Sequence, residues 1–224
     1  MALEIKKTKK EIGDVFGMNY KEAKLLDKLI KKHDLKNLLE LGFAHGVSSC
    51  YMASSLKDNG GGHLTTIDLI GAKDHRHPNI EELLEKVNLT EYVTPYFENT
   101  SYTWRLMKFI EENDEPIFDF CYIDGAHDWY NDGFAFLLVD KLLKPGGWIV
   151  FDDLNWTFAS SPSLKDSDYV KRMSDDEKNT PQIKKVFDLL VRTNENYHNF
   201  DVINNGWWGI AQKKNKKSFL DRFK

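Results

Sequence analysis

The chain has 224 residues, of which 41% are hydrophobic and 29% are charged, so it can bury one core or two small ones. Its 31 basic and 35 acidic side chains leave a formal charge of −4, which argues against a protein built around a nucleic-acid backbone. No apolar run approaches the ~20 residues of a membrane helix, and the charged N-terminus lacks the apolar stretch of a signal peptide. The two cysteines, Cys50 and Cys121, lie far apart in apolar segments. We therefore expect a cytoplasmic globular protein with reduced cysteines that binds neither nucleic acid nor membrane.

Helical and strand-like patterns alternate from about residue 20 to residue 151. Apolar side chains at helical spacing predict helices within 23–33, 46–56, 80–87, 102–110 and 134–142, the last ended by Pro145-Gly-Gly147. Short β-branched or apolar runs predict strands at 37–41, 63–68, 92–97, 118–123 and 148–151. Such alternation is typical of a parallel sheet with helices on both faces.

The C-terminal part departs from this alternation. Thr180-Pro181 predicts an N-cap and first turn for a helix over 183–190. Two strand-like runs, 200–204 and 207–212, are then joined by Asn205-Gly206, a strong hairpin signal. We therefore expect an α/β fold: a seven-stranded, mostly parallel Rossmann-like sheet with a C-terminal antiparallel hairpin.

No linker or repeat divides the sequence, so we expect a single domain over 1–224. Within it, residues 1–35 are expected to form an N-terminal helical or lid segment. Residues 155–179 form a long irregular stretch, and loops of this length inside a domain are usually lids or binding loops. We predict that they form a substrate loop, with Trp156, Phe158 and Tyr169 able to line an acceptor pocket.

A glycine-containing turn follows the first predicted strand: Glu40-Leu-Gly42-Phe-Ala-His-Gly46-Val-Ser48. Glycines at such a turn let a ligand approach the backbone, and the helix that follows offers free N–H groups. The phosphate-loop and dinucleotide patterns both fail, because Ala44 and Val47 stand where these patterns need glycine. A plain tight turn explains the loop equally well.

Four aspartates follow predicted strands. Asp68 ends the second strand, where a carboxylate can accept the hydrogen bonds of ribose hydroxyls. Asp124 follows the fourth strand, and Asp152 and Asp153 follow the fifth. Because parallel strands end at one edge, these last three carboxylates should meet and repel one another, which a hard divalent cation would relieve. The alternative is that Asp152 or Asp153 caps a following turn.

These motifs carry a family resemblance over roughly residues 36–155. The glycine loop resembles motif I of the class I S-adenosylmethionine methyltransferases. Asp124-Gly-Ala-His127 and the run from Leu142 to Asp153 resemble the metal-dependent small-molecule O-methyltransferases, most closely the macrolide sugar O-methyltransferases and cephalosporin-hydroxylase-like proteins. Caffeoyl-CoA O-methyltransferases are similar in outline but carry Asp-Ala-Asp-Lys and Asp-Asn at these places, so a catechol-type acyl-CoA acceptor does not follow.

The resemblance implies an enzyme that uses S-adenosylmethionine to methylate a hydroxyl of a small molecule such as a vicinal diol, a sugar or a catechol. It also implies a divalent cation, with Mg²⁺ as the expected metal. It implies metal ligation by Asp124, Asp152 and Asp153. It implies cofactor contacts by Glu40, Gly42, Ala44, Gly46, Ser48, Asp68, Thr100, Ser101 and Asp124. For Thr100 and Ser101, capping of a helix is an equally good account.

Four histidines lie near these motifs. His127, three residues after Asp124, titrates near neutrality and is the candidate general base for the acceptor hydroxyl, with a neutral supporting or capping role as its alternative. His45 lies in the cofactor loop and is more readily explained by packing against the cofactor or the substrate, and His75 and His77 by an exposed loop.

Two other functions remain open at this stage. One keeps the cofactor and moves the substrate to nucleic acid or protein. The other is a relative that binds the cofactor without transferring a methyl group. The oligomeric state, a homo-oligomer included, cannot be read from the sequence.

Overall fold

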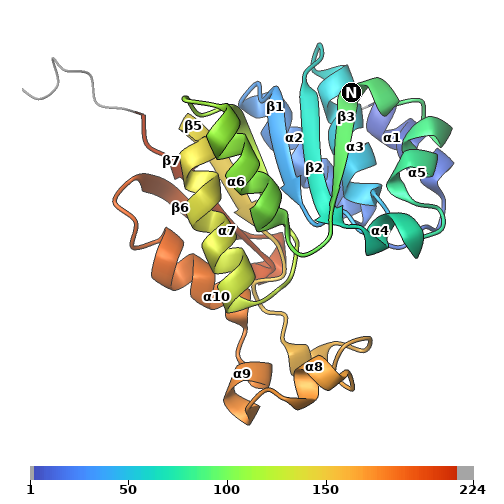
Figure 1. Ribbon diagram of the computed structural model, residues 1–224. Coiled ribbons are helices and arrows are strands. Elements are labelled where there is room, and N and C mark those ends of the chain that lie inside the picture. The colour runs from blue at the N-terminus through green and yellow to red at the C-terminus, as the bar shows by residue number, and fades with distance from the viewer. Residues whose placement is uncertain (1–2, 216–224) are drawn as a thin grey trace, which may run out of the picture.

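A computed structural model describes residues 3–215, which form a seven-stranded sheet in the order β3-β2-β1-β4-β5-β7-β6 (Figure 1). The strands are β1 (Asn37–Leu41), β2 (His63–Leu69), β3 (Val93–Glu98), β4 (Phe118–Ile123), β5 (Leu143–Phe151), β6 (Tyr197–Ile203) and β7 (Trp208–Lys213). The first five pair in parallel, whereas β7 runs antiparallel to both β5 and β6. The predicted mostly parallel sheet with a terminal hairpin is thus confirmed.

Helices cover both faces of the sheet. They are α1 (Leu3–Ile12), α2 (Tyr20–Lys32), α3 (Val47–Asp58), α4 (Gly71–Asp74), α5 (Ile80–Lys86), α6 (Tyr102–Glu112), α7 (Trp129–Leu142), α8 (Asp168–Lys171), α9 (Asp175–Asn179) and α10 (Gln182–Val186). Residues of α1, α2, α3 and α5 share one apolar core, and residues of α6, α7 and α10 share the other. In the central strand β1, Leu38 enters the first core, while Leu39 and Leu41 enter the second, as strand alternation requires. None of the helices within 3–215 is long and apolar enough to cross a membrane.

Several element boundaries differ from those predicted. Pro145-Gly-Gly147 lies inside β5 and does not end the preceding helix, which stops at Leu142. Helix α7 also begins earlier than the apolar pattern indicates, because the Asp128 side chain accepts a hydrogen bond from the Asn131 N–H and caps it.

The C-terminal third shows larger differences. The helix after Thr180 begins at Gln182, with Pro181 as its N-cap, and its end over Phe187–Val191 widens into a π-helix. The hairpin is present, but its connection includes Asn204–Gly206 as a short 3₁₀ turn and is longer than the predicted two residues. Residues 155–179 are not irregular throughout: they contain a 3₁₀ turn and the short helices α8 and α9, which lie below the sheet in Figure 1.

Candidate active site

A cleft of about 970 Å³ lies across the carboxyl ends of the parallel strands. The segments after β1, β2, β4 and β5 line it, and residues 16–18 of the N-terminal segment close one side. This edge is where ligands bind in open parallel sheets. Nine of the residues predicted to bind cofactor or metal line the cleft: Gly42, Ala44, Ser48, Asp68, Thr100, Ser101, Asp124, Asp152 and Asp153. His127 lines it as well.

The glycine loop is tied to the end of β2. One carboxylate oxygen of Asp68, Oδ2, accepts hydrogen bonds from the backbone N–H groups of Phe43 (2.9 Å) and Ala44 (2.7 Å). The other, Oδ1, accepts from the N–H of Leu69 (2.6 Å). Asp68 therefore fixes the loop backbone and still lines the cleft, where each oxygen retains capacity for a further hydrogen bond.

The two glycines of the loop meet their own chain. Both have positive φ, +85° at Gly42 and +88° at Gly46. A Cβ on Gly42 would lie 2.1 Å from the carbonyl oxygen of Asp124, and one on Gly46 would lie 2.5 Å from the side chain of Ile80. Gly46 does not line the cleft. The need for glycine at both positions thus comes from close packing of the loop, whereas the sequence suggested close approach of a ligand.

Glu40 does not face the cleft either. Its side chain is fully buried, and its carboxylate accepts hydrogen bonds from the hydroxyls of Ser48 (2.5 Å), Ser49 and Thr66 (2.6 Å). Burial raises the pKa of Glu40 to about 7, although the three hydroxyl donors oppose that rise. The predicted direct cofactor contact by Glu40 is therefore replaced by an internal role beneath the loop, shared with Ser48.

Thr100 and Ser101 follow the end of β3. Ser101 caps α6, because its Oγ accepts a hydrogen bond from the N–H of Thr103 (3.1 Å). Both residues also line the cleft. Ser101 thus caps a helix and lines the cleft at the same time.

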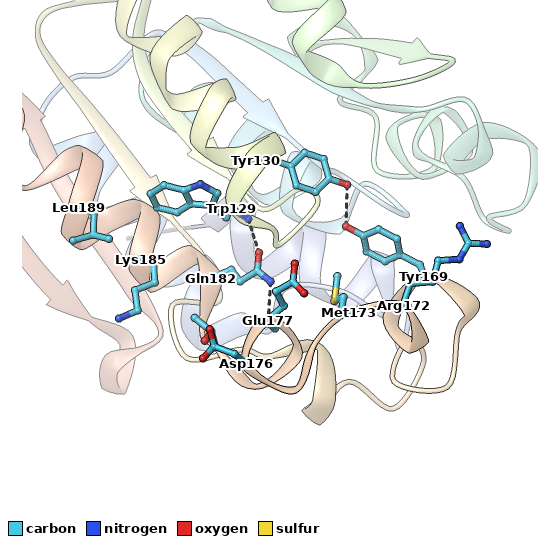
Figure 2. Close-up of a pocket in the computed structure, with 11 residues that line it drawn as sticks. Trp129, Tyr130, Tyr169, Arg172, Met173, Asp176, Glu177, Gln182, Lys185 and Leu189 are labelled. Atoms are coloured by element: carbon cyan, nitrogen blue, oxygen red, sulfur yellow. Dashed lines mark hydrogen bonds between the residues drawn. The ribbon is translucent and has the colours of Figure 1, made fainter.

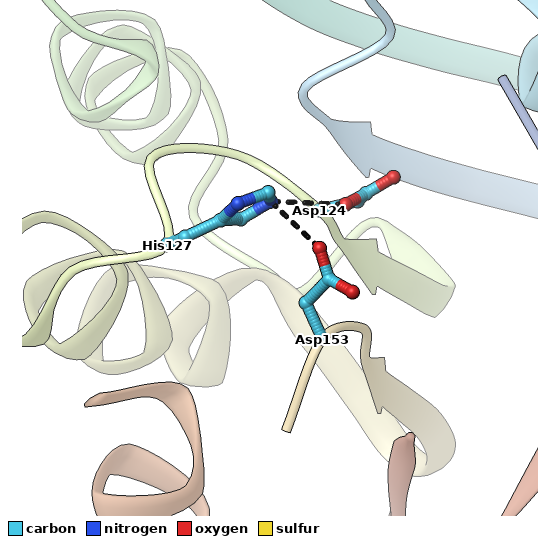
Figure 3. A group of neighbouring side chains, drawn as sticks. All are labelled: Asp124, His127 and Asp153. Atoms are coloured by element: carbon cyan, nitrogen blue, oxygen red, sulfur yellow. Dashed lines mark hydrogen bonds and ion pairs between the residues drawn. The ribbon is translucent and has the colours of Figure 1, made fainter. Parts of the chain in front are cut away.

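Asp124, His127 and Asp153 form a compact cluster at the other end of the cleft (Figure 3). The imidazole Nε2 of His127 lies 3.2 Å from Oδ1 of Asp124 and 3.6 Å from Oδ2 of Asp153. One ligand atom from each residue lies within 4.8 Å of the other two. Strand ends supply the two acids, and the loop after β4 supplies the histidine, whose backbone has a φ of +59°.

The cluster concentrates negative charge. Burial raises the pKa of Asp153 to about 6, and the nearby charges of Asp124 and Glu22 act in the same direction. Burial opposes the charged form of His127, but the hydrogen bond to Asp124 and the charges of Asp124 and Asp153 raise the pKa of the imidazole to about 9. With no cation bound, the imidazole therefore carries a proton at neutral pH and compensates the carboxylates.

Asp152 is held differently from its two partners. Its Oδ2 accepts a hydrogen bond from the Tyr122 hydroxyl, and its Oδ1 accepts one from the N–H of Asp153 (2.6 Å). Burial and the charges of Asp124 and Asp153 raise its pKa well above the usual range. Asp152 lines the cleft but is not part of the compact cluster. Neither Asp152 nor Asp153 caps the turn that follows, since Thr157 does so.

Of the other three histidines near the motifs, His75 and His77 lie in an exposed loop as expected, whereas His45 does not face the cleft. His75 and His77 are exposed, although His75 lines the cleft. His45 does not line the cleft, and its Nδ1 lies 2.7 Å from the carbonyl oxygen of Pro78.

The three aromatic residues predicted for an acceptor pocket have separate locations. Trp156 lines the cleft, with its ring 4.9 Å from the His127 ring. Phe158 is buried behind Trp156. Tyr169 lines a second pocket of about 600 Å³ between α7 and residues 169–189, where its hydroxyl lies 2.9 Å from that of Tyr130 (Figure 2).

Several site residues were not found from the sequence. Glu22, from α2, adds a further carboxylate to the cleft, and Trp207 closes the cleft from the hairpin. Tyr102 and Asp132 are buried behind the loop that carries His127. The available signal was an acidic residue, Asp132, in the first turn of the largely apolar α7, since none of these residues belongs to a local motif.

A family model described as a methyltransferase domain matches residues 39–154, just over half of the chain. The chain belongs to this methyltransferase domain family. It is 28% identical over 174 residues to "Probable caffeoyl-CoA O-methyltransferase 3" of Dictyostelium discoideum, which covers 76% of this chain and 63% of that protein. It is 29% identical over 154 residues to "Caffeoyl-CoA O-methyltransferase" of Populus kitakamiensis, with 66% and 60% covered. The chain thus spans less than two thirds of the length of these relatives.

Solved structures of methyltransferases have the same fold. An O-methyltransferase of Bacillus cereus in complex with SAH superposes with a TM-score of 0.64 at 20% identity, covering 94% of this chain and 89% of that one. The O-methyltransferase TomG of Streptomyces achromogenes in complex with SAM gives a TM-score of 0.64 at 17% identity, with 95% and 90% covered. At these identities the likeness establishes the Rossmann-like methyltransferase fold.

Proposed function

We propose that the protein is an S-adenosylmethionine-dependent O-methyltransferase that acts on a hydroxyl of a small molecule with the help of a divalent cation. One observation carries this proposal: the acid–histidine cluster and the Asp68-bound glycine loop open into the same cleft. A methyl donor at one end and an activated hydroxyl at the other would then meet in a single cavity. The relatives named as caffeoyl-CoA O-methyltransferases support the reaction class.

The residues of the loop end fit the cofactor. Asp68 offers carboxylate oxygens to ribose hydroxyls, and Ala44, with φ +48°, brings the loop backbone to the cleft without a bulky side chain. Leu69, 44% exposed at the end of β2, presents an apolar surface on which a planar ring can pack. When bound, S-adenosylmethionine supplies a methyl group on a positively charged sulfur.

The cluster end fits a hard divalent cation by its donor chemistry. Carboxylate oxygens of Asp124 and Asp153 converge there, with Asp152 beside them, and Mg²⁺ or Mn²⁺ prefers such ligands. When bound, the cation would polarise an acceptor hydroxyl and lower its pKa.

His127 is proposed to take the proton. In the proposed reaction, the acceptor oxygen would form a bond to the methyl carbon as the carbon–sulfur bond breaks, and the hydroxyl proton would pass to Nε2 of His127. This role requires a neutral imidazole. Asp124 and Asp153 hold the proton on the ring, so neutralising their charge would lower its pKa toward the ordinary value.

Apolar side chains border the cluster end. Trp156 packs against the His127 ring, and Trp207 and the 84% exposed Phe16 lie at the same cleft. They suit a small organic acceptor. The loop Asp124-Gly-Ala-His127 and the pair Asp152-Asp153 differ from the caffeoyl-CoA pattern, so we propose a vicinal diol, a sugar or a catechol-like molecule as the acceptor class.

The proposal predicts metal-dependent methyl transfer. Purified protein with methyl-labelled S-adenosylmethionine should methylate at least one member of a diol panel in Mg²⁺ or Mn²⁺, and excess chelator should remove the activity. Asp153→Asn should lower metal affinity and turnover together, because it removes a charged oxygen ligand. Asp201→Asn, an exposed change on β6, is the matched control and should keep full activity.

Two results would overturn the proposal. Turnover that persists in chelator and in Asp153→Asn would exclude the cation. Tight binding of S-adenosylhomocysteine with no methyl transfer to any hydroxyl would favour a relative that binds the cofactor without this reaction.

A further inference from the structure

The loop that carries His127 rests on a buried pair of polar side chains. Asp132, in the first turn of α7, has no exposed surface, and Tyr102, the first residue of α6, is 6% exposed. The Tyr102 hydroxyl donates a hydrogen bond to Oδ1 of Asp132. Such a pair in an otherwise apolar core is costly unless its hydrogen bonds are satisfied.

Both side chains also bind the loop backbone. Oδ2 of Asp132 accepts the N–H of His127 at 2.8 Å, and the Tyr102 oxygen accepts the N–H of Ala126 at 3.4 Å. The Tyr102 ring lies so close to the loop that a Cβ on Gly125 would come within 2.6 Å of it. Two successive N–H groups of the loop are thus fixed by these two side chains, of which Tyr102 also lines the cleft and Asp132 does not.

This attachment matters because the loop conformation is unfavourable by itself. His127 adopts a φ of +59°, a region that a residue with a side chain rarely enters without support. In that conformation its Nε2 points between Asp124 and Asp153. Without the two anchors, the loop would be free to relax and carry the imidazole away from both acids.

We infer that Asp132, supported by Tyr102, is a positioning residue that holds His127 in register with the Asp124–Asp153 pair. The inference rests on the proposed function, because the cluster it positions is the proposed hydroxyl-activating site. Asp132 lies behind the loop and does not line the cleft, so it acts only through His127.

The same helix offers a matched control. Near the other end of α7, the hydroxyl of buried Tyr197 donates to Asp140 at 2.9 Å, far from the cleft. Tyr197→Phe therefore removes a buried tyrosine–aspartate hydrogen bond from α7 without touching the loop. Any effect common to Tyr102→Phe and Tyr197→Phe would be a structural one.

The test uses the metal-free protein first. The Nε2 proton of His127, bonded to Asp124, should give a slowly exchanging imidazole signal by NMR, identified by its absence in His127→Ala. We expect Asp132→Leu to abolish this signal and Asp132→Asn to restore it, because the amide oxygen can still accept the His127 N–H. Tyr102→Phe should weaken the signal, and Tyr197→Phe should leave it unchanged.

Turnover and Mn²⁺ affinity are measured next. Because Asp132 acts through His127, the proposed base, Asp132→Leu should lower kcat toward the roughly 10²–10⁴-fold loss typical of a removed general base, while Mn²⁺ affinity stays close to wild type. If Asp132→Leu and Tyr102→Phe give the same results as Tyr197→Phe in the NMR signal and in kcat, the inference is overturned. If Asp132→Leu does not fold, the comparison of Tyr102→Phe with Tyr197→Phe decides between the two outcomes. If the wild type binds no Mn²⁺, the proposal of a bound cation is wrong, while the NMR signal of the His127 imidazole proton still decides the positioning role.

Discussion

The His127 imidazole lies between the carboxylates of Asp124 and Asp153, and its charge depends on theirs. As the proposed base, it should contribute mainly in the transition state. His127→Ala should therefore lower kcat roughly 10²–10⁴-fold at saturating metal while S-adenosylhomocysteine affinity stays close to wild type. Steady-state rates and calorimetry on the same preparations measure both quantities.

The Mn²⁺ affinity of the same variant distinguishes two roles for Nε2 of His127, general base and metal ligand. A tenfold or larger loss of Mn²⁺ affinity in His127→Ala would make the imidazole a metal ligand, and the base would have to be sought elsewhere. His63→Ala is the control, because that imidazole contacts Thr94 at 2.8 Å on β3 and lies outside the cleft.

Glu40 makes a separate prediction about stability. Its folded pKa, about 7, lies above its ordinary value of 4.5, so the folded state binds the extra proton between these two values. Stability from this group is full below about pH 4.5 and falls as the pH rises toward 7. A shift of this size corresponds to about 3 kcal/mol in the free energy of unfolding.

Glu40→Gln removes this titration and keeps the size and polarity of the side chain. Urea unfolding at pH 5 and pH 8 should show the wild type losing more stability over this interval than Glu40→Gln. The difference between the two proteins is the quantity to compare, because other buried acids titrate in both. Parallel pH dependence in the two proteins would show that Glu40 is ionised throughout.

At the scale of elements, most of the sheet could be predicted from the sequence. The strand Phe118–Ile123 is a near-continuous apolar run, and the chain segments before and after it show the helical spacing of apolar residues. This alternation predicts a parallel sheet, in which Asp124 and Asp153 lie at the same edge. Helices α8 and α9 could not be predicted in this way. Each has only four or five residues, too few to show a helical period, and depends on side-chain caps from Ser167 and Ser174.

Site residues that belong to a local sequence motif could be predicted, whereas residues that only the packing of distant segments brings together could not. Gly42 and Asp68 were placed correctly at the cleft, because strand order alone brings them there. Asp132 meets Tyr102 across thirty residues of sequence, and only the packing of α6 on α7 brings them together. Glu40 turned inward because it shares a strand face with Leu38, and its acid was satisfied by hydroxyls on α3 and β2.

At the scale of the whole molecule, one cleft joins two chemically different ends. Asp68 lies near the end of β2, and Asp152 and Asp153 follow β5. Asp124 follows β4, which lies between these two strands in the sheet. The cofactor and the cation should therefore bind by largely separate contacts. Their affinities for the protein then depend on each other only through Asp124.

This separation gives the last prediction. S-adenosylhomocysteine, titrated by calorimetry, should bind within about threefold of the same affinity in Mg²⁺ and in excess chelator, because a coupling of 1–3 kcal/mol would change it 5–150-fold. Asp68→Asn should weaken that binding and leave Mn²⁺ affinity unchanged, since within residues 3–215 the hydrogen bonds that Asp68 accepts come from the glycine loop and Leu69. Asp153→Asn should do the reverse. A cofactor affinity that falls more than about tenfold in chelator would mean that the two ends act as one site, with Asp124 shared between both ligands.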